Sequence, residues 1–150
     1  MALKYAAALK ACSDQPCPPR KYKPRVATGV FRFVRNTATP ECFEPFAENM
    51  YLGCPCIHYA ISFWSTLEVA QEKYSSLAKV NDDDGETARK RFGDHIGEID
   101  LDANDGSMTE PNKNGHISLH PEKGAALETR VKKYVRCDYF KTRTARRTNA

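Results

Sequence analysis

Apolar side chains mark four short stretches of the chain as β-strands. Residues 29–35 are predicted as the first strand, in which Val30, Arg32 and Val34 share one face and Phe31, Phe33 and Arg35 lie on the other. A later stretch that contains the single tryptophan is apolar almost throughout, which predicts a buried central strand. The predicted strands lie at residues 29–35, 56–64, 95–101 and 116–120.

After the second predicted strand the apolar positions change to a helical period. Leu67, Ala70 and Tyr74 fall on one stripe, which predicts an amphipathic helix. Ser65 and Glu68 have the spacing of a capping box at its start. Shorter helices are predicted at residues 2–12 and 87–92, and residues 127–135 fit either a helix or a last strand.

These elements predict an α+β fold, with a small mixed or antiparallel sheet of about four or five strands and two or three helices. We place the domain at residues 26–140 and expect residues 102–115 to form a loop. We predict residues 1–25 as a basic, proline-rich N-terminal arm. Its four prolines (Pro16, Pro18, Pro19 and Pro24) predict that residues 13–25 are extended and do not pack, because proline lacks an amide donor.

Charge is concentrated at the two ends of the 150-residue chain, whose net charge is +4. Residues 1–25 contain six basic side chains and one acidic one, and the tail at 141–150 contains four basic side chains and no acid. Flexible basic termini of this kind can contact the phosphates of nucleic acid, or serve only as solvated tails. No apolar run approaches the roughly 20 residues of a membrane helix, so we expect no membrane contact.

Six cysteines are spread along the chain: Cys12, Cys17, Cys42, Cys54, Cys56 and Cys137. The first 14 residues do not form a convincing signal peptide, since Lys10 interrupts a short apolar stretch. We therefore expect a cytoplasmic protein whose thiols stay free. If the chain were exported instead, the even number of cysteines would permit disulfide pairing.

Cysteines and histidines recur at alternate positions in two places. Cys54, Cys56 and His58 would share one strand face, and so would His116 and His120. Two such faces could hold zinc, but the single proline between the two cysteines differs from the two-residue knuckle of structural zinc sites. We therefore favour no metal, and keep a metal-assisted hydrolase or nuclease that uses His116 and His120 as an alternative.

One further constellation lies at the junction between the second predicted strand and its helix. An early strand carries Arg32 and Arg35, and the junction carries the hydroxyls of Ser62, Ser65 and Thr66. A helix start with free amides favours anions. Over residues 29–78 this arrangement resembles the ADP-ribosyltransferase-like fold, in particular its small bacterial toxin versions.

The resemblance implies a function and a set of site residues. It implies NAD as a substrate bound by Arg32 or Arg35, a nicotinamide pocket shaped by Ser62, Ser65 and Thr66, and Tyr74 packed on the nicotinamide. A late glutamate would stabilise the cationic transition state at the ribose. Among Glu98, Glu110, Glu122 and Glu128 we favour Glu122, because it follows the predicted strand at 116–120.

We therefore expect a toxin-like or effector-like enzyme that transfers ADP-ribose from NAD or hydrolyses NAD. This expectation requires the guanidinium groups and the junction hydroxyls to converge on one cavity. The first alternative is a nucleic-acid or ribosome-associated binding protein that uses its basic termini. The second alternative is the metal-assisted hydrolase described above.

Overall fold

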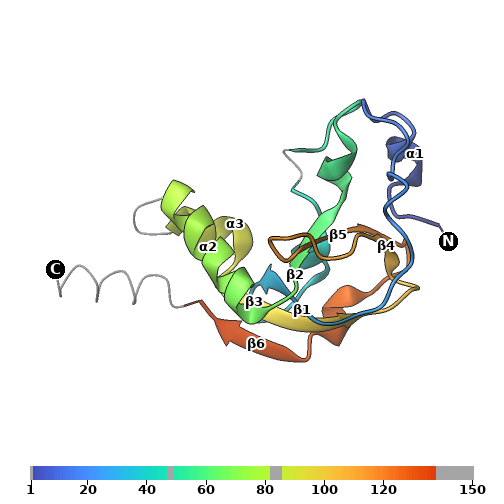
Figure 1. Ribbon diagram of the computed structural model, residues 1–150. Helices are drawn as coiled ribbons and strands as arrows, with labels where there is room; N and C mark the ends of the chain where they lie inside the picture. Colours follow the sequence, from blue (N-terminus) through green and yellow to red (C-terminus); the bar gives the residue numbers. More distant parts are fainter. Residues whose placement is uncertain (1, 47–48, 82–85, 138–150) are drawn as a thin grey trace, which may run out of the picture.

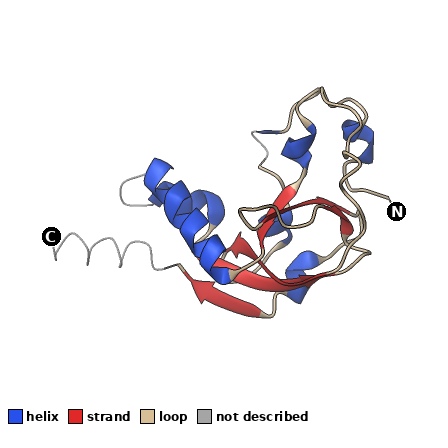
Figure 2. Ribbon diagram, viewed as in Figure 1, coloured by secondary structure: helices blue, strands red, loops and turns tan. Residues whose placement is uncertain are grey.

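The computed structural model describes residues 2–46, 49–81 and 86–137. Over these ranges the chain forms one antiparallel sheet of six strands in the order β4-β5-β2-β1-β3-β6 (Figures 1 and 2). The strands are β1 (Ala27–Val34), β2 (Ile61–Trp64), β3 (His95–Leu101), β4 (Gly106–Met108), β5 (His116–Pro121) and β6 (Lys133–Arg136). The predicted α+β class is confirmed, whereas the predicted number of four or five strands is too low.

Both extra strands are short. β4 occupies three residues within the stretch predicted as a loop, and β6 occupies four. Alternation over three or four residues is too brief to separate a strand from a loop in the sequence. Residues 127–135, which fitted a helix or a strand, contain both: a 3₁₀ turn η4 (Leu127–Arg130) precedes β6.

Two helices lie side by side on one side of the sheet, as Figure 1 shows. They are α2 (Leu67–Asn81) and α3 (Glu86–Phe92), and both were predicted from the sequence. The stripe of α2 is buried at Ala70, Tyr74 and Ala78, so the helical period is confirmed. The predicted capping box is not formed; instead the Thr66 hydroxyl accepts a hydrogen bond from the Val69 amide (3.2 Å).

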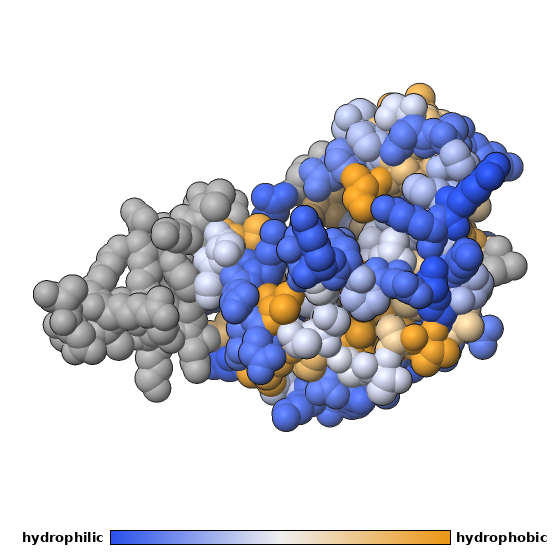
Figure 3. Space-filling model, viewed as in Figure 1, coloured by the Kyte–Doolittle hydropathy of each residue, from blue (hydrophilic) through white to orange (hydrophobic). Residues whose placement is uncertain are grey.

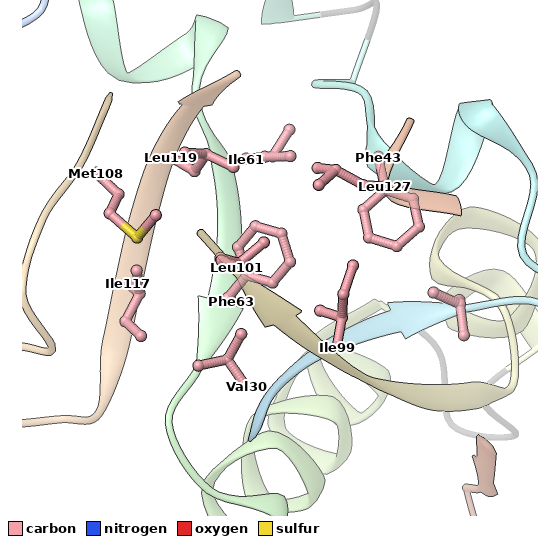
Figure 4. Close-up of a cluster of buried hydrophobic side chains, with 11 residues drawn as sticks. Val30, Phe43, Ile61, Phe63, Ile99, Leu101, Met108, Ile117, Leu119 and Leu127 are labelled. Carbon is pink, nitrogen blue, oxygen red and sulfur yellow. The ribbon is translucent and has the colours of Figure 1, made fainter. Parts of the chain in front are cut away.

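The sheet separates two apolar clusters. One cluster lies on the face of Val30 and Val34, and its side chains point toward one another in Figure 4. The other cluster lies under α2 and contains Phe33 and Trp64, whose rings stack at 4.5 Å between centroids. The two predicted faces of the first strand are therefore confirmed. Arg32 lies on the same face as Val30, which takes its side chain toward the interior.

The second predicted strand is shorter than expected. Residues 56–64 do not form one strand: a 3₁₀ turn η3 (Cys56–Tyr59) follows Pro55, and β2 begins only at Ile61. Cys56 and Tyr59 are buried while Ile57 is exposed. In a 3₁₀ turn, residues three positions apart lie on the same side, so residues 56 and 59 are buried together. The apolar residues before β2 therefore belong to this turn and not to a buried strand.

The N-terminal segment (residues 2–25) is packed against the sheet, contrary to the prediction of an unpacked arm. It contains a short helix, α1 (Ala6–Leu9), and bridges Leu3 to Glu122 and Lys23 to Met108. Leu9, Cys12 and Tyr22 are buried. The chain after α1 is irregular, as its prolines predicted. Tyr22, which lies between Pro19 and Pro24, nevertheless anchors it through its buried ring. The predicted basic tail at 141–150 lies outside the described residues.

The helices of the described ranges are all too short or too polar to cross a membrane. On the face shown in Figure 3, hydrophobic residues are interspersed among hydrophilic ones. Such single exposed apolar residues are normal on protein surfaces.

Candidate functional site

A cavity of about 1470 Å³, which we call the cleft, opens beside the line where β1 and β2 separate. The two strands pair at Phe31 and Trp64. Residues of the chain that connects β1 to β2 also line the cleft. The walls of the cleft come from α2, the end of α3, residues 41–46 with Asn49, the stretch from η3 to β2, and the loop before β5. Arg32, Arg35, Ser62 and Ser65 all line it, so four of the predicted site residues share one cavity.

Arg32 forms part of the wall of the cleft. Its guanidinium donates hydrogen bonds to the backbone carbonyls of Cys42, Ser62 (2.8 Å) and Glu44 (3.3 Å). These bonds use three of the five N–H groups of a guanidinium. Burial lowers the pKa of Arg32 to about 10, so the side chain remains a cation at neutral pH. Arg32 therefore joins β1 to the part of the β1–β2 connection that lines the cleft, and it contributes positive charge to the cleft.

The rim of the cleft has an excess of cations. Arg35 is exposed and donates to the Lys90 carbonyl (3.0 Å), and Arg91 lies over the ring of Phe46, 4.8 Å from its centroid. Among the lining residues five carry cationic groups and three carry carboxylates: Arg32, Arg35, Lys73, Arg91 and Lys113 against Glu41, Glu44 and Glu72. An anionic ligand is therefore favoured over a cationic one.

A serine and a histidine meet inside the cleft. The Ser62 hydroxyl lies 2.8 Å from Nε2 of His116, across the neighbouring strands β2 and β5. Burial, with a smaller contribution from the charge of Lys73, lowers the pKa of His116. The imidazole is therefore neutral at neutral pH, and its Nε2 can accept the hydroxyl proton. The Trp64 ring packs edge-on to the His116 ring at 5.9 Å, which holds the imidazole in place.

The strand-to-helix junction adds one more cleft residue. The Ser65 amide donates to the Gly115 carbonyl (2.8 Å), which fixes the loop that leads into β5. Gly115 has a φ of +74°, and a Cβ there would lie 2.9 Å from the Ser65 hydroxyl. Glycine is therefore required for this close approach. Thr66, by contrast, is not part of the lining and serves as the helix cap described above.

Two predicted catalytic residues lie away from the cleft. Tyr74 is buried under α2, where its hydroxyl donates to the Gly93 carbonyl (2.7 Å) and burial raises its pKa. Glu122 follows β5 at the end that meets the N-terminal segment, and its carboxylate accepts from the Gly124 amide. Neither residue lines the cleft. The geometry therefore gives no support to a catalytic role for Tyr74 or Glu122.

Only two of the predicted zinc ligands come together: Sγ of Cys56 lies 3.5 Å from Nε2 of His120. His58 and His116 line the cleft, and Nδ1 of His58 lies 2.8 Å from the Asn49 carbonyl. His120 is buried at the other end of β5, beside Cys56. Four residues along a strand span about 13 Å, so His116 and His120 cannot bind one ion. The separation gives no support to a metal-assisted hydrolase in which both histidines hold the same ion.

The cysteines also differ from the expectation of free thiols. Cys17 and Cys56 form a disulfide, while Cys54 is free and buried. Cys42 is a cleft residue that the sequence analysis did not single out. Burial alone would raise the pKa of its thiol, but hydrogen bonds from Thr39 and Arg35 and the charge of Arg32 lower it.

Sequence reasoning missed the Ser62–His116 pair although it named both residues. The contact depends on the register of β2 against β5, in which Trp64 faces His116. Register between strands that are more than 50 positions apart leaves no local signal in the sequence. The chain matches no known protein family, no curated protein and no solved structure.

Proposed function

We propose that the cleft binds a dinucleotide of the NAD type and breaks its nicotinamide–ribose bond, passing ADP-ribose to water or to an acceptor. The observation that carries the proposal is that Arg32, Arg35, Ser62 and Ser65 line one cavity. These four residues belong to the set that the resemblance to ADP-ribosyltransferases assigns to NAD, although Thr66 and Tyr74 of that set lie outside the cleft. The cavity of about 1470 Å³ is also larger than the roughly 300–1,000 Å³ of most small-molecule sites, which suits a long ligand.

Each part of such a ligand has a matching group in the cleft. The pyrophosphate suits the cationic rim, where Arg35, Lys73 and Arg91 lie. A nicotinamide or adenine ring suits the aromatic wall, to which Phe33 and Trp64 contribute. The proposal therefore assigns charge recognition to the rim and ring recognition to the wall beside β2.

The Ser62–His116 pair would act on the incoming nucleophile. Neutral His116 takes a proton from the attacking water through Ser62, while the bond between the ribose carbon and the nicotinamide nitrogen breaks and nicotinamide leaves. The products are ADP-ribose, nicotinamide and one proton, which His116 returns to solvent. A carboxylate would stabilise the positive charge on the ribose. In the cleft this role falls to Glu41, Glu44 or Glu72 rather than to Glu122.

The test is release of nicotinamide and ADP-ribose from NAD by the full chain. Ser62→Ala should lower kcat at least about 100-fold, the lower end of the range for a proton-transfer group. Ser118→Ala is the matched control. Ser118 is the residue of β5 that pairs with Ser62 of β2, but its hydroxyl is buried against Tyr22 and does not line the cleft. The absence of any NAD turnover or binding by the wild type would overturn the proposal.

The same pair of side chains supports a second candidate, a serine hydrolase. Here Ser62 itself attacks an ester carbonyl and His116 takes its proton, as the 2.8 Å contact permits. The ester C–O bond breaks, the alcohol leaves with the proton from His116, and water then releases the acid from Ser62. An organophosphonate probe distinguishes the two candidates. A covalent adduct at Ser62, located by mass spectrometry and absent from His116→Ala, together with inertness to NAD, would favour the hydrolase.

A further inference from the structure

At the opposite end of β5 from the cleft, three potential metal ligands come together. They are Cys17 of the N-terminal segment, Cys56 at the start of η3 and His120 of β5, which we call the Cys17–Cys56–His120 cluster. The three ligand atoms all lie within 4.8 Å of one another, and Sγ of Cys56 is 3.5 Å from Nε2 of His120. The three residues come from distant parts of the chain, so the fold itself assembles the cluster.

His120 has no ordinary partner in this cluster. Its side chain is 1% exposed and packs against the Tyr22 ring at 4.9 Å. Its Nδ1 is buried without a hydrogen-bond partner among the described residues, and its Nε2 faces a disulfide sulfur. A buried polar atom without a partner destabilises the fold, because its lost hydration is not replaced. A disulfide alone gives no reason for an imidazole at this place, whereas a metal ion would use the lone pair of Nε2, the ring nitrogen that faces Cys56.

The protonation state of His120 also suits a ligand. Burial lowers the pKa of His120 to about 4, so the imidazole is neutral at neutral pH. Metal ions bind the neutral form of histidine and the thiolate form of cysteine. Two thiolates and one imidazole form a ligand set that zinc prefers, while magnesium and calcium prefer oxygen.

We propose that the reduced Cys17–Cys56–His120 cluster binds one zinc-type divalent cation, so that the cluster alternates between a disulfide and a metal site. Both forms would join the N-terminal segment to η3, the turn that precedes β2. In the metal form the ion takes Sγ of Cys17, Sγ of Cys56 and Nε2 of His120. The fourth tetrahedral position falls to water or to a thiol of the neighbouring buried pair, Cys12 and Cys54.

The exchange balances with an external dithiol or phosphine as the reductant. The disulfide accepts two electrons and two protons and becomes two thiols. A dithiol supplies both and becomes a disulfide, whereas a phosphine supplies the electrons, takes the oxygen of one water molecule and becomes a phosphine oxide, and that water supplies the protons. Both thiol protons are released when the cation binds. With Zn–S bonds of about 2.3 Å, the two sulfurs must separate to about 3.8 Å. Side-chain rotation of Cys17, which is only half-buried, can provide this separation.

The experiment loads the full chain with Zn²⁺ after reduction by a phosphine, removes excess metal by desalting, and measures bound zinc by elemental analysis. About one zinc per chain is expected in the reduced protein and none in the oxidised protein. Cys17→Ser and Cys56→Ser should weaken binding at least about 100-fold, more than the loss of a supporting group would. Cys42→Ser is the matched control, since Cys42 lies in the cleft and should leave binding unchanged.

Co²⁺ gives a readout that does not depend on variants. The reduced wild type should show sulfur-to-cobalt charge-transfer absorption and the intense d–d bands of a tetrahedral site, and His120→Gln should shift the d–d bands. Reduced wild-type protein that retains no Zn²⁺, or zinc binding that survives in the Cys17→Ser/Cys56→Ser double variant, would overturn the proposal. No enzymatic activity enters this test, so its failure leaves the proposed function of the cleft untouched.

Discussion

His116 and His120 differ in their surroundings although both lie on β5 and on the same face of that strand. His116 lies at the cleft, where its Nε2 meets the Ser62 hydroxyl. His120 lies at the other end, where its Nε2 meets the sulfur of Cys56. The difference arises from distant segments: α2 and the loop before β5 border the first histidine, and the N-terminal segment covers the second. One strand can therefore carry two sites with different chemistry.

The largest expected effect separates the two histidines by activity. His116→Gln should lower kcat for NAD cleavage at least about 100-fold, because the proton acceptor of Ser62 is lost. His120→Gln should leave kcat close to that of the wild type, since His120 is outside the cleft. Steady-state kinetics on both folded variants measure the difference. Equal losses of activity in the two variants would contradict the distinction between the two sites.

The second effect concerns the covalent link at the His120 end. Cys17 and Cys56 are 39 positions apart, so their disulfide restricts the unfolded chain considerably. Reduction in the presence of a chelator should lower the free energy of unfolding by about 3–4 kcal/mol. Urea unfolding with and without a phosphine reductant measures this loss. Cys17→Ser should show the same stability as the reduced wild type, and a reductant should not destabilise it further.

The third effect is the pH dependence that His120 imposes on stability. Its pKa is about 4 in the folded state and about 6.5 when exposed in the unfolded chain. The unfolded state therefore binds a proton first as the pH falls, and stability is lost between pH 6.5 and pH 4. The loss should reach about 3 kcal/mol. Urea unfolding at several pH values should show a smaller loss for His120→Gln, and an unchanged pH slope would contradict the burial of a neutral imidazole.

The smallest effect concerns the charge beside His116. The cation of Lys73 helps to lower the pKa of His116, although burial contributes more. Lys73→Met should therefore raise the pKa of His116, and the acidic limb of the pH–rate profile should move to higher pH. The profile of kcat/KM measures this shift. Movement of the limb to lower pH, or no movement, would contradict the assignment of His116 as the proton acceptor.

Local patterns predicted the parts of the fold that depend on neighbouring residues. The faces of β1 and the helix α2 follow from side-chain periods of two and 3.6, and both are confirmed. The N-terminal segment was judged by its prolines, yet Leu9, Cys12 and Tyr22 dock it to the sheet. Docking depends on contacts between segments that are distant in the sequence. The composition of the N-terminal segment does not predict these contacts.

The candidate site was predictable to a similar extent. Arg32, Arg35, Ser62 and Ser65 were named from residue type and position, and they line the cleft together. The role of Arg32 was not predictable, because no side-chain period shows that the Cys42, Glu44 and Ser62 carbonyls face its guanidinium. Glu122 was chosen for its place after a predicted strand, but that end of β5 points away from the cleft.

The most direct test of the proposed function uses the fluorescence of Trp64, the single tryptophan in the chain, which lines the cleft. NAD is titrated into the wild type and into Arg35→Ala, with free tryptophan as the control for light absorbed by the ligand. The cleft as described predicts saturable quenching in the wild type and weaker affinity in Arg35→Ala. Quenching that follows the free-tryptophan control without saturation would contradict dinucleotide binding in the cleft.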